Sequence, residues 1–264
     1  MENLVAKGLG KRYGRAWALR GVSLAVQPGQ CLGVLGHNGS GKSTLLAVLA
    51  GVQRASEGQV LLGGAELRAR AQRRRIGYAP QRPGLMDELT VGENLRFWQG
   101  VYGLRGEGCL PELCGALGLA PLLPKRAGAL SGGMRQRVSL AAALLHGPGY
   151  ILLDEPFAAL DAKYARALTA LLQARMAQGA GVVLCTHLPQ AAAQLCGEVL
   201  VLRGGRQAAW RSVQGLGPQP EQALAVLLGE EEENEPDGRA GGLSRYNEED
   251  MEYGVQKLWL PPAG

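Results

Sequence analysis

Short runs of apolar residues, each bounded by glycine, proline or charged residues, recur along this chain. Apolar runs of about four to eight residues are typical of strands whose two faces are both covered. Six runs fit this description, in chain order "CLGVLG", "GQVLLGG", "RRIGYAP", "GYILLDEP", "GVVLCTH" and "EVLVLRGG". They predict the central strands of a buried sheet.

Segments with helical apolar spacing lie between several of these runs. The pattern predicts helices over Lys42–Leu49, Val91–Tyr102, Gly132–Leu145 and Ala162–Gln178. Alternating strands and helices indicate an α/β fold, with a mostly parallel sheet covered by helices on both faces. From about residue 82 to residue 130 the sequence has helix-like segments and no clear strand, which we interpret as a helical insertion.

The end of the chain differs in composition from the body. Residues 230–242, "EEEENEPDGRAGG", have the composition of a disordered acidic linker. Residues 243–264 regain aromatic and aliphatic side chains. This tail is either a disordered terminus or a docking segment that tethers the chain to a partner.

The net charge of +5 is unevenly distributed. From Glu230 onward ten acidic residues outnumber three basic ones, which leaves +12 on the preceding body. A basic body suits phosphates, nucleic acid or an anionic membrane face, and an arginine-rich solvated surface equally well. The arginine cluster at residues 68–75 has no interleaved aromatic side chains, so we expect no nucleic acid partner.

Hydropathy and cysteine content indicate in which cellular compartment the chain is expected. No uncharged run of about 18 apolar residues is present, and the start, "MENLVAKGLGKRYG", does not resemble a signal peptide. The five cysteines have no metal-ligand spacing, and an odd number does not suit a disulfide framework. We therefore expect a cytosolic chain whose membrane role would come from a partner.

A glycine-rich loop supplies the first candidate chemistry. "GHNGSGKS" matches G-x-x-x-x-G-K-[ST], and it follows an apolar run and precedes a helical pattern, as this phosphate-binding motif requires. Glycines let backbone N–H groups surround a triphosphate, and Lys42 adds a full charge toward the β- and γ-phosphates. We predict that the ATP-binding residues are Gly36, His37, Asn38, Gly39, Ser40, Gly41, Lys42, Ser43 and Thr44.

A second motif lies at the end of "YILLDEP". Asp154 closes an apolar strand run and Glu155 follows it directly, so the two carboxylates can point to different faces. Asp154 and the Ser43 hydroxyl suit a Mg²⁺ ion, and Glu155 suits the polarisation of an attacking water. We therefore predict ATP and Mg²⁺ as ligands.

The stretch "LSGGMRQRVSLAAALL", directly before "YILLDEP", carries a family resemblance. It resembles the signature of ATP-binding subunits of ABC transporters, and the likeness extends over about residues 3–228. The resemblance implies a P-loop NTPase of ABC type: a RecA-like, mostly parallel sheet core, an antiparallel β subdomain and the helical insertion at about residues 82–130. It implies an ATP-binding domain over residues 1–229.

The resemblance also assigns individual residues. Tyr13 matches the aromatic that stacks on adenine, although Trp17 is a rival for that role. Gln81 matches a glutamine that reaches the metal and the catalytic centre, and His187 matches a catalytic histidine at the γ-phosphate. Asp161 matches the end of the loop after the catalytic glutamate. Two departures from the family pattern, Met134 and Ala159, remove no phosphate ligand.

The resemblance further implies partners. In the family, Ser131, Gly132 and Gly133 would face the ATP held by a second ATPase subunit, in a homodimer or heterodimer. Polytopic transmembrane subunits would dock on the helical insertion, where Phe97, Trp98 and Tyr102 either line the groove or pack in the core. The chain would then be peripheral, on the cytoplasmic face of the membrane.

The resemblance points less firmly to a subfamily. "LTVGENLRFWQGVYGL" and "DEPFAALD" most resemble the haem-exporter ATPase of cytochrome c maturation, whereas "LSGGMRQRV" resembles multidrug- and copper-linked exporters. A hydrolysing exporter subunit is the main hypothesis. The alternatives are a non-transport ABC ATPase and a regulator that binds ATP without turnover.

Overall fold

The computed structural model describes residues 3–67, 72 and 74–229. The predicted acidic linker and C-terminal tail lie outside the described residues. The elements, in chain order, are β1 (Leu4–Tyr13), β2 (Ala16–Val26), β3 (Cys31–Leu35), α1 (Lys42–Leu49), β4 (Glu57–Leu62), β5 (Ala65–Glu66), β6 (Ile76–Ala79), α3 (Val91–Tyr102), α4 (Leu110–Leu117), η1 (Ala120–Leu122), η2 (Ala127–Ala129), α5 (Gly132–Leu144), β7 (Tyr150–Asp154), α6 (Ala162–Ala177), β8 (Gly181–Thr186), α7 (Pro189–Leu195), β9 (Glu198–Arg203), β10 (Arg206–Ser212), η3 (Gln214–Leu216) and α8 (Pro220–Gly229).

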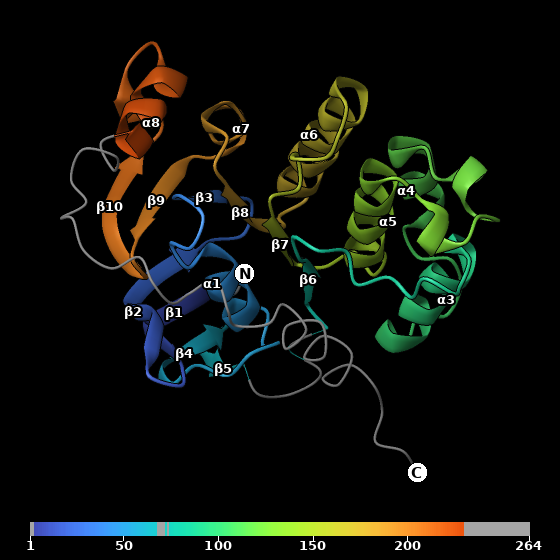
Figure 1. Ribbon diagram of the computed structural model, residues 1–264, viewed down its shortest axis with the longest axis horizontal. Helices are drawn as coiled ribbons and strands as arrows, with labels where there is room; N and C mark the ends of the chain where they lie inside the picture. The colour runs from blue at the N-terminus through green and yellow to red at the C-terminus, as the bar shows by residue number, and fades with distance from the viewer. Residues whose placement is uncertain (1–2, 68–71, 73, 230–264) are drawn as a thin grey trace.

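A six-stranded sheet in the order β10-β9-β3-β8-β7-β6 forms the centre of the fold (Figure 1). Its pairs are parallel from β9 to β6, and only β10 runs antiparallel to its neighbour. All six apolar runs are strands, five of them in this sheet. The prediction of a mostly parallel sheet is therefore confirmed.

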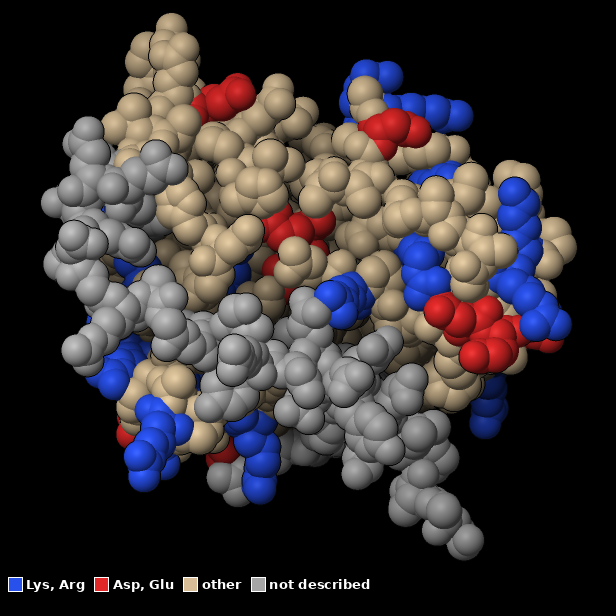
Figure 2. All heavy atoms as spheres, viewed as in Figure 1, with Lys and Arg blue, Asp and Glu red and all other residues tan. Residues whose placement is uncertain are grey.

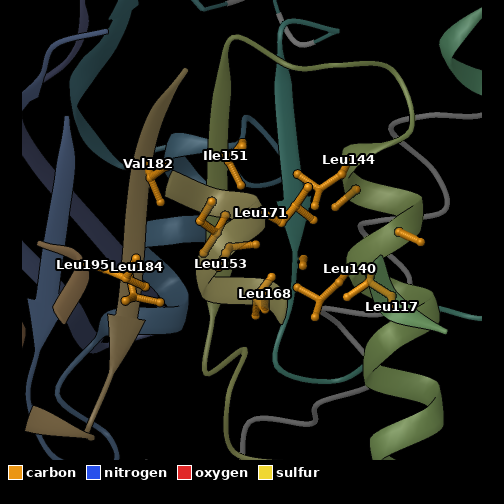
Figure 3. Close-up of a cluster of buried hydrophobic side chains, with 14 of the residues drawn as sticks. Leu117, Leu140, Leu144, Ile151, Leu153, Leu168, Leu171, Val182, Leu184 and Leu195 are labelled. Atoms are coloured by element: carbon orange, nitrogen blue, oxygen red, sulfur yellow. The ribbon is translucent and has the colours of Figure 1, made fainter. Parts of the chain in front are cut away.

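Side chains alternate between two hydrophobic cores on the two faces of this sheet. In β7, Ile151 and Leu153 join one core, and Tyr150 and Leu152 join the other. The first core lies under α5, α6 and α7, and Figure 3 shows Leu140 and Leu144 of α5 directed at β6, with Leu168 and Leu171 of α6 over β7. Such alternation buries both strand faces, which explains why the strands are continuously apolar.

The second core is shared with a smaller antiparallel sheet in the order β2-β1-β4-β5. Leu4 and Leu19 of that sheet belong to the same cluster as Leu45 and Leu46 of α1. The helix α1 is thus enclosed between the small sheet and the large one. This arrangement places the start of α1, with the glycine-rich loop, at the carboxyl end of β3.

The region between residues 82 and 130 contains α3, α4 and two short 3-10 helices (Figure 1, right). Thr90 caps α3 through a capping box with Glu93. The fully buried Asn94 receives a hydrogen bond from the backbone N–H of Met86 at 2.8 Å and donates to its carbonyl at 3.0 Å. These contacts pin the segment that leads from Gln81 into α3.

The predicted helices agree closely with the structure. The bounds of α1 and α3 are as predicted, and α5 and α6 each end one residue earlier. Over the described residues, no helix has the length and apolarity needed to cross a membrane. Figure 2 shows Lys and Arg side chains scattered in separate groups over the visible described surface of one face.

Candidate functional site

The glycine-rich loop connects β3 to α1, and its shape depends on glycine. Gly36 has φ +153°, and a Cβ there would lie 2.5 Å from the Leu202 carbonyl oxygen. Gly41 has φ +104°, and its Cβ would lie 2.6 Å from the carbonyl of Ala18. Both positions thus combine a left-handed backbone with a close approach that excludes a side chain.

Lys42 lies inside this loop. Its ammonium donates to the carbonyl oxygens of Gly36 at 2.6 Å and His37 at 3.1 Å, and its side chain is only 6% exposed. The carboxylate of Glu155 lies 3.8 Å away. The loop backbone and a facing carboxylate therefore hold one buried cation at the N-terminus of α1, where the helix dipole also favours an anion.

Asp154 ends β7 beside the start of α1. Its carboxylate is hydrogen-bonded to the Ser43 hydroxyl and to the backbone N–H of Gln81, whose side chain is exposed. Within the described residues its Oδ1 atom has no hydrogen-bond partner, although it is fully buried. A buried carboxylate oxygen next to a hydroxyl is the donor set that Mg²⁺ takes in phosphate sites, so these residues fit that ion.

Burial raises the pKa of Asp154 to about 6, mainly through desolvation. The neighbouring Glu155 also raises it, whereas the hydrogen bond from Ser43 and the charge of Lys42 lower it. The negative charge of Asp154 is therefore only partly compensated in the ligand-free chain. A bound divalent cation would compensate it, which favours cation binding at this carboxylate.

Glu155 has an unusual backbone. Among the described residues it is the only one other than glycine with a positive φ, +48°. Its N–H donates to the Cys185 carbonyl of β8 at 2.9 Å, which holds this conformation. The side chain is 5% exposed, and Oε1 lies 2.9 Å from Nδ1 of His187.

Glu155 and His187 are within ion-pair distance, but the geometry is not that of a hydrogen bond. Among the described residues, Oε1 of Glu155 has no hydrogen-bond donor. The backbone N–H of His187 donates to the other oxygen, Oε2, at 3.4 Å. The His187 ring is 51% exposed. The structure therefore brings together three predicted catalytic and phosphate-binding residues, Lys42, Glu155 and His187, at the ends of neighbouring strands.

Tyr13 lies on the small sheet, next to the glycine-rich loop. Its hydroxyl bonds to the side chains of Thr44 in α1 and Gln53, and burial raises its pKa. Trp17 lies between two arginines, with the guanidinium carbons of Arg12 and Arg20 at 5.7 Å and 5.3 Å from its ring centroid. Tyr13 is thus in direct contact with the phosphate-binding helix, whereas the contacts of Trp17 are with its own hairpin.

Ser131, Gly132 and Gly133 form the exposed start of α5. Ser131 is the N-cap, and its hydroxyl accepts from the Met134 N–H at 3.4 Å. A Cβ on Gly133 would lie 2.5 Å from the Ala159 carbonyl, while Gly132 has open space. Asp161 serves as the N-cap of α6 and accepts from the Tyr164 N–H at 3.0 Å.

The helix α1, which follows the glycine-rich P-loop, and the helix α5, which carries the signature residues, cover opposite faces of the large sheet. Buried residues of α1 belong to one core, and those of α5 belong to the other. Figure 1 shows the two helices well separated, with β6 and β7 between them. The N-termini of α1 and α5 therefore lie on elements that pack on opposite faces of the sheet.

Comparison with known proteins identifies the family. Residues 19–158, more than half of the chain, match the family model described as ABC transporter. The chain belongs to the ABC transporter family. Its ATP-binding domain contains the glycine-rich loop and the Asp154–Glu155 pair within the matched residues.

Curated relatives agree with this assignment. The chain is 36% identical over 211 residues to the Nod factor export ATP-binding protein I of Ralstonia nicotianae, covering 78% of this chain and 66% of the relative. It is 34% identical to the protein of the same name from Rhizobium etli, covering 75% of this chain and 65% of the relative. The chain thus spans about two thirds of the length of these relatives.

Solved structures confirm the ABC-type P-loop fold. The ATP-binding subunit of an ABC transporter superposes with a TM-score of 0.77 at 30% identity, covering 86% of this chain and 99% of that one. A dimeric ATP-binding cassette in a post-hydrolysis state, bound to ADP and Pi, gives a TM-score of 0.71 at 26% identity, covering 79% of this chain and 98% of that one.

Sequence reasoning missed several neighbours of the site. The contacts of Tyr13 with Thr44 and Gln53, the backbone donor at Gln81, and a hydrogen bond from His37 to the C-terminal helix all join distant segments. No local sequence pattern could have revealed them.

Proposed function

We propose that this chain is the ATP-hydrolysing subunit of a membrane exporter. The observation that carries the proposal is the convergence of Lys42, Asp154 and Glu155 at the start of α1 and the end of β7. Lys42 binds the β- and γ-phosphates, and the Ser43 hydroxyl and the Asp154 carboxylate would hold Mg²⁺, with the Gln81 side chain as a further candidate ligand. The ion supplies charge neutralisation for the phosphates.

Glu155 acts as the general base for the attacking water. Its carboxylate is buried and faces Lys42, which holds the γ-phosphate beside it. The half-exposed His187 ring lies 2.9 Å from the Glu155 carboxylate, where it would contact the outer oxygens of a bound γ-phosphate. Tyr13 stacks on adenine at the open side of the loop.

A second ATPase subunit completes each ATP site. In one chain His37, Asn38 and Gly39 of the loop are exposed, and α5 packs on the other face of the large sheet. Two chains facing each other would place Ser131, Gly132 and Gly133 of one against the P-loop of the other. A dimeric structure among the relatives of known structure supports this arrangement.

Transmembrane subunits dock on the helical region. A shallow pocket is lined by Trp98 and Tyr102 of α3, by Tyr78 and Pro80 around the end of β6, and by residues of α5. Phe97 packs edge-on against Trp98, with ring centroids 5.6 Å apart. The pocket adjoins the segment that carries Gln81, whose backbone is hydrogen-bonded to Asp154. A helix of a membrane partner bound there would therefore be coupled to the ATP site. The chain is then peripheral to the membrane.

The export direction rests on the relatives, which are named for Nod factor export. Neither of these relatives is a haem exporter, so the comparisons give no support to the haem substrate that the sequence suggested. We propose an export substrate that the membrane subunits select.

The proposal is tested by ATP turnover of the purified chain with Mg²⁺, wild type against Lys42→Ala and Glu155→Gln. Loss of general-base catalysis should slow Glu155→Gln by about 10²-fold or more while ATP still binds. Lys42→Ala should lose ATP affinity itself in a fluorescent-nucleotide titration. Turnover that persists in both variants would contradict the proposed site.

A further inference from the structure

The second residue of the glycine-rich loop reaches the last described helix. Nε2 of His37 lies 2.9 Å from the carbonyl oxygen of Leu228, 191 residues further along the chain. A carbonyl oxygen can only accept, so the imidazole N–H of His37 donates to Leu228, in the last described turn of α8.

Two further hydrogen bonds join the β9–β10 hairpin to α8 and to the loop. Arg203, at the end of β9, donates from Nη2 to the Leu227 carbonyl at 3.1 Å. The backbone N–H of Gly205, in the turn between β9 and β10, donates to the Ser40 carbonyl at 3.0 Å. The loop is thus held by the β9–β10 turn on one side and by α8 on the other.

The helix α8 is itself anchored. Leu224 is fully buried and Leu228 nearly so, both in the core that lies under α5, α6 and α7. Val226, on the opposite side, is 59% exposed. The carbonyl that His37 contacts therefore belongs to Leu228, whose side chain is packed in the core.

We propose that His37 is a positioning residue that fixes the phosphate loop of this site to the C-terminal helix α8. The proposal rests on the proposed function, because the positioned loop is the one that binds ATP. Lys42 hydrogen-bonds the His37 carbonyl, so fixing the His37 ring also sets the carbonyl that orients the lysine. By linkage, nucleotide in the loop stabilises the end of α8 as much as α8 stabilises the bound loop.

Amide hydrogen exchange of the nucleotide-free full chain tests the contact without any activity. His37→Phe keeps a ring and removes the donor, whereas His37→Gln keeps an N–H donor of similar reach. The last-turn amides of α8 should exchange about threefold to tenfold faster in His37→Phe, the range expected for one lost hydrogen bond, and at the wild-type rate in His37→Gln. Equal exchange in all three proteins would overturn the proposal.

The same exchange measurement with bound nucleotide gives a second test. A non-hydrolysable ATP analogue with Mg²⁺ should slow exchange at the end of α8 in wild type and His37→Gln, and not in His37→Phe. In turnover assays His37→Phe should raise KM for ATP severalfold with kcat nearly unchanged. The control Val226→Ser, on the exposed face of α8, should leave KM at the wild-type value.

These outcomes separate the two proposals. A wild-type chain without ATP turnover would refute the proposed function, while exchange in the nucleotide-free variants would still report on the contact. Protection of α8 by the analogue in His37→Phe, equal to that in wild type, would refute the positioning role even if the chain hydrolyses ATP.

Discussion

The two carboxylate residues at the end of β7, Asp154 and Glu155, are each in an energetically unfavourable environment or conformation. Asp154 is buried, with one oxygen that has no hydrogen-bond partner in the described part of the chain, and Glu155 has a left-handed backbone. Each feature costs stability in the ligand-free chain, and such features are common at functional sites. The energetic cost of both can be measured in variants.

Asp154→Asn should stabilise the ligand-free chain at neutral pH. The folded pKa of Asp154, about 6, is above its ordinary value of 3.8, so the folded state binds the extra proton and stability falls as pH rises through this window. Two pKa units correspond to at most about 3 kcal/mol. The Tm of Asp154→Asn should exceed wild type by several degrees at pH 8 and by about half as much at pH 5, where the unfolded carboxyl is already ionised.

Thermal unfolding without nucleotide or Mg²⁺, from pH 5 to pH 8, measures this difference. A variant less stable than wild type at pH 8 would show that the Asp154 charge is already compensated by its neighbours. Added Mg²⁺ and ATP should reverse the order, because the charged carboxylate binds the cation more strongly than a neutral amide does.

Glu155→Gly should be more stable than Glu155→Ala by about 1 kcal/mol. At φ +48° an L-residue has its Cβ too close to the following carbonyl, and glycine avoids that contact. Urea unfolding of the two inactive variants compares them directly. Equal stabilities would mean that this backbone relaxes once the glutamate is removed.

Much of the site was predictable at the scale of residues, and part was not. The spacing around Lys42 and the position of Asp154 after an apolar strand predicted residues that the fold does bring together. The left-handed conformation of Glu155 was not predictable, since it depends on the hydrogen bond to Cys185 in a different strand. The role of His37 depends on a helix 191 residues away.

At the scale of elements, α5 is joined to its surroundings by two arginines. Arg137 is buried, donates to the Leu117 carbonyl at the end of α4 at 3.0 Å, and lies 3.9 Å above the Tyr164 ring of α6. Arg135 pairs with Asp87 at 2.6 Å, in the segment that follows Gln81. The signature helix is therefore fixed to α4, α6 and the Gln81 segment together.

Arg137→Lys should destabilise the chain although it keeps the charge. Lysine cannot stack its head group on Tyr164 while bonding the carbonyls at the end of α4. We expect a loss of about 1–3 kcal/mol in the free energy of unfolding, measured in urea. The matched change Arg135→Lys, at a more exposed pair, should cost less than about 1 kcal/mol. Equal effects of the two would contradict the coupling role of Arg137.

The elements most visible in the sequence were those buried on both faces. The parallel strands have continuous apolar runs because each lies between two cores. The strands β1 and β2 were not evident as runs, because the small sheet has one exposed face and irregular register between them. The short helices α7 and α8 begin at prolines and have too few turns for a clear period.

At the scale of the whole molecule, the position of α1 and α5 on opposite faces predicts a site shared between two chains. A mixture of two inactive variants tests it. Lys42→Ala removes the P-loop charge, and Gly132→Asp places a carboxylate at the signature, where the structure has open space for a side chain. If the chain forms homodimers, a mixed dimer would contain one intact site, so mixing should restore ATP turnover that neither variant has alone. Turnover that stays absent in the mixture would argue for a site within one chain or a different partner subunit.

Closure of two chains on ATP is tested most directly by the mass of Glu155→Gln in solution with ATP and Mg²⁺. We expect this variant to bind ATP without hydrolysing it, so that two chains remain closed on the nucleotide. Light scattering should then give twice the mass of the 27.8 kDa chain with ATP and Mg²⁺, and the single mass with ADP. A variant that binds ATP but remains at the single mass would contradict closure of two copies of this chain on ATP.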